Sequence, residues 1–104
     1  MPLPTPTSWT ASAPLVAPLT REGDTPYSVK DPTLVEHDGT WHMFCTVRSA
    51  VRSHQIEHLT SDSLDDWSGA TRSLLTCVDG YFCAPQVFYF RPHGLWYLVY
   101  QTHA

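Results

Sequence analysis

The chain has 104 residues, enough for one small domain, and a formal net charge of −4 from six Lys and Arg against ten Asp and Glu. Nucleic-acid-binding proteins neutralise phosphates with clustered Lys and Arg, so this charge balance argues against a nucleic-acid partner. No run of about 20 apolar residues is present, so the sequence predicts no membrane-spanning helix. Nine prolines and five glycines argue against long helices.

The first part of the chain, residues 1–26, is rich in Pro, Thr and Ser and has little periodicity. We expect an extended lead-in there, followed by a β-domain over residues 27–104. The start has neither the basic region nor the apolar region of a secretory signal, so no signal peptide is predicted in this chain.

A β-hairpin is predicted directly after this lead-in. Residues 33–37 are β-prone, and residues 40–47 form a second apolar and aromatic run. Between them stands Asp38-Gly39, which is typical of a two-residue hairpin turn.

The middle of the chain gives weaker signals. Residues 55–61 alternate imperfectly between apolar and polar side chains, which favours a half-exposed strand. Residues 63–68 are interpreted as a turn, with Asp65-Asp66 solvated rather than forming a carboxylate pair. Residues 70–75 fit either a short strand or a helical turn.

A second hairpin is predicted from residues 85–90, a turn at 91–94, and residues 95–101. Both strands are almost wholly apolar or aromatic, a composition typical of strands buried on both faces. Two hairpins and one connecting strand have too little mass to cover such strands. We therefore expect the domain to be truncated at the C-terminus, with covering elements missing.

The two hairpins share a layout, because Asp31-Pro32 precedes the first and Ala84-Pro85 precedes the second. The two pairs are roughly 50 residues apart, close to the period of a propeller blade. The fold class predicted is therefore all-β, with about two blades of a β-propeller.

Asp31 is the residue best placed for chemistry. Pro32 is expected to hold Asp31 extended, and the neighbouring Lys30 could keep its carboxylate ionised. A fixed, ionised carboxylate at the start of a strand can act as a general base. The alternative is an ordinary turn aspartate.

Cysteines and histidines give no metal signature. The three cysteines have no Cys-x-x-Cys spacing and are interpreted as small buried residues. A Cys77–Cys83 disulfide remains an alternative if the protein is exported. The six histidines lack the His-Glu-x-x-His spacing of a zinc site and are interpreted as surface or turn residues.

Several motifs together resemble glycoside hydrolase family 62, the α-L-arabinofuranosidases. The similarity runs from about residue 8 to residue 102 in the family's order, and family 43 is the nearest confusable relative. The matching segments are Ser8–Thr10, Pro14–Leu15, Ser28–Val35, His37–Phe44, Asp66–Ser68, Ala84–Phe90 and Leu95–Gln101.

This resemblance implies the first two blades of a five-bladed β-propeller, as an N-terminal fragment of the domain. It implies that Asp31 is the general base of an inverting hydrolysis and that Lys30 binds the arabinose. The general-acid Glu and a further Asp would lie in later blades, so activity of this chain alone is not expected. The resemblance also implies arabinoxylan or arabinan as substrate and secretion of the protein. Calcium is expected only in a full-length propeller, with no metal site in this chain.

Two further hypotheses stay open. The chain could be a non-catalytic carbohydrate-binding or interaction module, in which Trp41 or Trp67 stacks on sugars. It could also be a truncated reading frame without activity.

Overall fold

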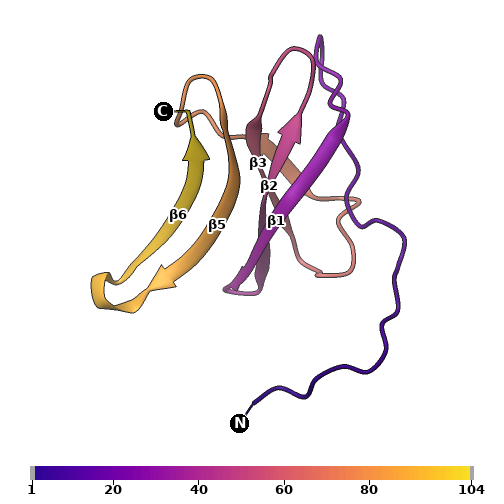
Figure 1. Ribbon diagram of the computed structural model, residues 1–104, viewed down its shortest axis with the longest axis vertical. Coiled ribbons are helices and arrows are strands. Elements are labelled where there is room, and N and C mark those ends of the chain that lie inside the picture. Colours follow the sequence, from indigo (N-terminus) through magenta and orange to yellow (C-terminus); the bar gives the residue numbers. More distant parts are fainter. Residues whose placement is uncertain (1, 104) are drawn as a thin grey trace.

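The computed structural model describes residues 2–103, and these form two antiparallel β-sheets (Figure 1). One sheet has four strands in the order β1-β2-β3-β4, and the other pairs β5 with β6. The elements are β1 (Ser28–His37), β2 (Thr40–Arg48), β3 (Gln55–Ser61), β4 (Thr71–Leu74), β5 (Phe82–Phe90), the 3₁₀ turn η1 (Arg91–His93) and β6 (Leu95–Thr102). The all-β prediction is confirmed, and within residues 2–103 no helix has the length and apolar character needed to cross a membrane.

The first hairpin is confirmed, with one difference in its first strand. β1 begins at Ser28 rather than Thr33, because the chain pairs with β2 on both sides of an irregularity between Lys30 and Thr33. Pro32 has no N–H to donate, so the ladder is interrupted there by a bulge and then resumes. The two turn residues have φ of 50° at Asp38 and 79° at Gly39, as a tight hairpin turn requires.

The strand predicted at residues 55–61 is confirmed as β3, and the ambiguous segment after it forms the short strand β4. The expectation that β3 is half exposed is confirmed, since Ile56, Glu57 and Leu59 are buried while the other four residues of the strand keep part of their surface exposed. Glu57 is tolerated there because Arg21 and Arg72 bind its two carboxylate oxygens at 2.7 and 2.6 Å.

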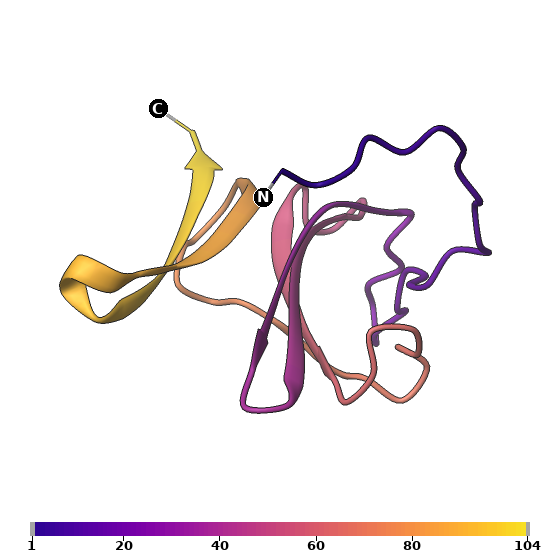
Figure 2. The same cartoon turned by 90° about the horizontal axis from the view of Figure 1, so that it is seen from below.

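The main hydrophobic core lies on one face of the four-stranded sheet. It consists of Met43, Cys45, Val47, Leu59 and Trp67. The lead-in has no strand or helix over residues 2–20, yet Val16 packs against this core. Figure 2 shows the lead-in running along the side of the sheet opposite the β5–β6 hairpin.

The second hairpin is also confirmed, and it mirrors the first. Its register shifts between Cys83 and Gln86, at Ala84-Pro85, as the first hairpin's register shifts at Asp31-Pro32. The hairpin projects away from the four-stranded sheet (Figure 2). Most side chains of β6 are exposed. No element within residues 2–103 therefore packs over the apolar side chains of this strand.

Candidate functional site

Asp31 lies in the bulge of β1, and its backbone differs from the expectation. The predicted extended conformation is wrong, because Asp31 has φ of 55°, in the left-handed region. A bulge needs one residue to turn the strand, and Asp is among the non-glycine residues that adopt this region most readily. Ala84 occupies the equivalent place in the second bulge with φ of 53°. The shared local geometry explains why an X-Pro pair stands at both positions.

The two bulges together line one hollow of about 300 Å³. Its lining residues are Asp31, Pro32, Thr33, Ala84, Pro85 and Gln86. Two threonine hydroxyls fix the hairpin against the first sheet here. The backbone N–H of Ala84 donates to Thr46 Oγ1 at 2.8 Å, and the N–H of Val87 donates to Thr33 Oγ1 at 3.3 Å. Asp31 is thus positioned opposite the second hairpin by hydrogen bonds that cross between the two sheets.

Lys30 and Asp31 face different surroundings. Both side chains are exposed, and no ion pair joins them among the residues that the structure describes. Lys30 lines a separate hollow, next to lead-in residues such as Leu15 and Val16. Successive side chains of a strand point to opposite faces, which accounts for the separation. The structure therefore does not support the expectation that the Lys30 ammonium holds Asp31 ionised.

The Asp31 carboxylate is one of several groups that act on the pKa of Tyr81. The hydrogen bond with Cys83 raises the pKa of Tyr81 most, and burial and then charges that include the Asp31 carboxylate act on it in addition. The Cys83 thiol lies 3.4 Å from the Tyr81 hydroxyl. Tyr81 therefore stays a protonated phenol at neutral pH.

The three cysteines form no disulfide, and the buried Cys45 is not a nucleophile. Cys45, Cys77 and Cys83 are all free, so the Cys77–Cys83 bridge is absent from this structure. Cys77 is exposed, contrary to the interpretation of all three as buried. Burial, followed by the charge of Glu57, raises the pKa of Cys45 to about 12. Since the thiolate is the reactive form, Cys45 is chemically inert at neutral pH.

The described residues do not fit a calcium site by themselves. Calcium takes six to eight oxygen ligands, often from several carboxylates. The hollow at Asp31 offers a single carboxylate, and within residues 2–103 no group of three or more His, Cys, Asp or Glu side chains could hold a metal ion. The calcium expectation concerns a longer propeller and stays a prediction.

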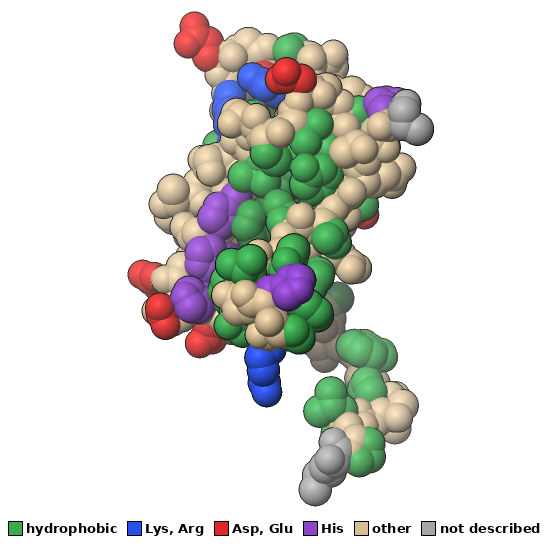
Figure 3. Space-filling view, turned by 90° about the vertical axis from the view of Figure 1, so that its left-hand side faces the viewer, with side chains coloured by type: hydrophobic (Ala, Val, Ile, Leu, Met, Phe, Trp, Pro, Cys, Tyr) green, Lys and Arg blue, Asp and Glu red, His purple; other side chains and the backbone are tan. Residues whose placement is uncertain are grey.

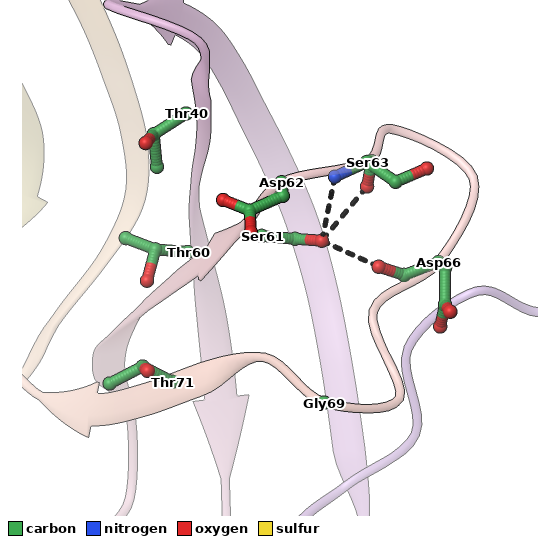
Figure 4. Close-up of a pocket in the computed structure, with 8 residues that line it drawn as sticks. All are labelled: Thr40, Thr60, Ser61, Asp62, Ser63, Asp66, Gly69 and Thr71. Atoms are coloured by element: carbon green, nitrogen blue, oxygen red, sulfur yellow. Dashed lines mark hydrogen bonds between the residues drawn. The ribbon is translucent and has the colours of Figure 1, made fainter.

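A second hollow, of about 320 Å³, lies at the turn that follows β3 (Figure 4). The Ser61 hydroxyl contacts the backbone oxygens of Ser63 and Asp66 and accepts a hydrogen bond from the Ser63 N–H. The Asp66 carboxylate points away from Ser61 and accepts two hydrogen bonds from Ser68. These bonds lower the pKa of Asp66. They identify Asp66 as a turn residue, as the sequence interpretation held.

The aromatic side chains proposed to stack on sugars are differently placed. Trp67 is only 4% exposed, and its indole N–H donates to the Leu64 carbonyl at 2.8 Å. Trp41 is half-buried and packs against the core. The expectation that Trp67 is exposed is wrong, because the turn before β4 folds this side chain under the sheet.

Sequence reasoning missed two features of this region. Gln86 shares the hollow with Asp31, and the repeated X-Pro pair was the signal that could have located it. The buried Glu57 with its two arginines was also missed, because the arginines stand far from it in the sequence.

Comparison with known proteins places these features in context. No protein-family model matches the chain. The chain is 36% identical to alpha-L-arabinofuranosidase C of Cellvibrio japonicus (strain Ueda107), covering 95% of this chain and 15% of that protein. It superposes on the catalytic domain of the Coprinopsis cinerea family 62 α-L-arabinofuranosidase with a TM-score of 0.80 and 34% identity, over 89% of this chain and 30% of that one.

A family 62 hydrolase solved in complex with xylotriose is similarly close. Its TM-score is 0.73 at 36% identity, and the match covers 85% of this chain and 27% of that one. These matches confirm the predicted resemblance to glycoside hydrolase family 62. The chain spans less than a third of the length of each of these three relatives.

Proposed function

We propose that this chain forms the part of an inverting α-L-arabinofuranosidase that carries the general base, and that Asp31 is that base. One observation carries the proposal. Asp31 presents an exposed carboxylate in a fixed bulge, at a hollow formed by two repeated bulges. It does so in a chain 34–36% identical to α-L-arabinofuranosidases.

The chemistry assigned to Asp31 is proton removal from water. The water oxygen attacks the anomeric carbon, the glycosidic C–O bond breaks, and Asp31 takes the water proton. A second carboxyl group protonates the departing oxygen, and in inverting enzymes the two lie about 6.5–9.5 Å apart. Among the lining residues of the hollow only Asp31 is acidic. The acid is therefore assigned to a part of the longer protein that this chain does not contain.

The fold assignment follows the same reasoning. The four-stranded antiparallel sheet β1-β2-β3-β4 has the composition of one propeller blade, and the β5–β6 hairpin would begin the next. The hollow at Asp31 then lies between two neighbouring blades of a five-bladed propeller. The repeated bulge in β1 and β5 supports this equivalence.

Arabinoxylan or arabinan is the substrate class we assign, with Lys30 contacting the sugar. A related structure with xylotriose supports a xylan-type ligand. Lys30 is exposed and has no ion-pair partner among the described residues, so its ammonium is available to a sugar hydroxyl. Because Lys30 lines a different hollow from Asp31, this contact is assigned to a part of the sugar substrate away from the bond that is cleaved. A polymeric substrate of this size also supports secretion.

A chimeric enzyme tests the proposal. This chain would replace the segment of the Coprinopsis cinerea catalytic domain on which it superposes, so that the remaining part of that domain supplies the acid. Release of arabinose from arabinoxylan, with the inverted anomer detected by NMR as the first product, is the expected result. Retention of configuration, or a folded chimera with no arabinose release, would contradict the assignment.

A non-catalytic carbohydrate-binding function is the second candidate, favoured by the single carboxylate of the hollow. Sedimentation of the 104-residue chain with insoluble xylan distinguishes the two. Binding that survives Asp31→Ala, without arabinose release from any chimera, would favour the binding module.

A further inference from the structure

Thr46 of β2 contacts both of the bulges that form the hollow at Asp31. Its backbone is paired with Lys30, the last residue of β1 before the bulge that contains Asp31. Its hydroxyl oxygen accepts a hydrogen bond from the N–H of Ala84, in the second bulge, at 2.8 Å. Thr46 therefore joins the first bulge, through its backbone, to the second bulge, through its side chain.

The Thr46 side chain lies inside the structure. It has no exposed surface, and β5 packs against β2 at this place. Figure 3 views the molecule from the side of the β5–β6 hairpin and shows hydrophobic side chains gathered across the middle of that face. A buried polar group needs a hydrogen-bond partner, and the Ala84 N–H is the partner of the Thr46 hydroxyl. The contact joins β2 to β5 and involves neither terminal segment of the chain.

The same hydrogen bond accounts for the backbone conformation of Ala84. Its φ of 53° lies in a region that alanine seldom adopts, and such a residue persists where its surroundings hold it. The register between β5 and β6 skips Ala84 and Pro85, so the Ala84 N–H lies outside that ladder and bonds to Thr46 instead. Loss of the Thr46 hydroxyl would leave this N–H without its acceptor and remove the restraint on the second bulge.

Thr33 makes the second hydrogen bond between the bulges. Its Oγ1 accepts the Val87 N–H at 3.3 Å, a longer contact than the one at Thr46. Thr33 is half-buried and lines the hollow, whereas Thr46 has no exposed surface and does not line it. Thr46 therefore cannot touch a sugar, and any effect it has on the reaction passes through the residues that it holds in place.

We propose, on the basis of the function proposed for Asp31, that Thr46 is a positioning residue for the hydrolysis. It fixes the second bulge against the first and so sets the place of the Asp31 carboxylate in the hollow. A general base must lie within hydrogen-bond reach of the proton it removes, about 2.6–3.2 Å between heavy atoms. Asp31 is exposed, so the position of its carboxylate depends on the bulged backbone that carries it.

The chimeric domain tests the proposal through arabinose release per folded molecule. Thr46→Val keeps the size of the side chain and removes its hydroxyl. It should lower kcat by about 10- to 100-fold while KM changes little, because a small misplacement of reacting groups has an effect of this size. Thr46→Ser keeps the oxygen and should restore most of the rate. Thr60→Val is the matched control, since Thr60 lines the separate hollow of Figure 4, and should leave kcat unchanged.

The Asp31→Asn chimera separates this proposal from the proposed function. If Asp31→Asn lowers the rate but Thr46→Val has the kcat of Thr60→Val, the proposed function stands and the positioning role is overturned. A loss that appears in KM alone, or one that Thr46→Ser does not restore, would also overturn the positioning role. An Asp31→Asn chimera with the full rate would instead overturn the proposed function, and the positioning role with it.

Hydrogen exchange of the Ala84 amide in the 104-residue chain tests the contact without any activity. The expected result is slow exchange that becomes faster in Thr46→Val and stays slow in Thr46→Ser. An Ala84 amide that exchanges as fast as the amides of the lead-in would overturn the proposal. If circular dichroism shows that Thr46→Val is unfolded, this exchange rate in the unmodified chain decides.

Discussion

Neutralising Glu57 is expected to cost a large part of the stability of this fold. Glu57 has no exposed surface, and both its oxygens bind arginines, Arg72 at 2.6 Å and Arg21 at 2.7 Å. Glu57→Gln keeps the shape of the side chain and removes its charge, which leaves two arginines without their anion. Breaking a buried pair in this way costs about 3–5 kcal/mol. The arginine side chains are 14% and 25% exposed, so water relieves part of that cost and the lower limit applies.

A loss of about 3 kcal/mol corresponds to a fall in Tm of about 12–24 °C for a domain of this size. Urea unfolding followed by circular dichroism measures the free energy, and a thermal scan measures Tm. Glu36→Gln is the matched control, since Glu36 is exposed on β1 and should shift unfolding by less than about 0.5 kcal/mol. A Glu57→Gln variant as stable as Glu36→Gln would refute the reasoning.

Three further predictions concern the core and its titratable groups. At pH 8, Cys77 should react with a thiol reagent within minutes. Cys45, with its pKa raised to about 12, should stay unmodified in the folded chain. Equal reaction rates of the two thiols would contradict the burial of Cys45. Burial and then a neighbouring histidine lower the pKa of His58 below its ordinary 6.5, so the folded state binds fewer protons than the unfolded state. Stability should therefore fall as pH drops below about 6.5, and His58→Gln should flatten that dependence of Tm; an unchanged slope would contradict it. Trp67→Ala should cost about 3–5 kcal/mol, whereas Trp9→Ala, at an 86% exposed position, should cost almost nothing in the same urea titration.

Both hairpins could be predicted because the turn residues and strand residues that specify a hairpin stand next to one another in the sequence. The tight turn between β1 and β2 requires positive φ at two successive residues, a conformation that few pairs other than Asp-Gly adopt readily. In the structure Asp38 and Gly39 both have positive φ. β3 was located by its alternation, but the complete burial of Glu57 within it was not predicted. The arginines that make Glu57 acceptable in the core come from the lead-in and from β4, and only the folded sheet brings them together.

The candidate site was predicted in part. Asp31 was identified, but Pro32 suggested an extended backbone where the bulge requires a left-handed one. Nothing in the local sequence shows that a strand resumes after a bulge, because that depends on pairing with β2. The hollow itself depends on the approach of two bulges far apart in the chain, so the place of Gln86 beside Asp31 appears only in the structure.

The rate of arabinose release by the chimeric domain, compared between Asp31→Asn and Asp38→Asn, tests the central claim most directly. The two aspartates are closely matched, since both are exposed and both have left-handed backbones, with φ of 55° and 50°. Asparagine adopts this conformation readily, so neither substitution should strain the fold. If Asp31 is the general base, Asp31→Asn lowers the rate by about 10²–10⁴-fold while Asp38→Asn leaves it unchanged. Equal rates in the two variants would contradict the assignment of Asp31.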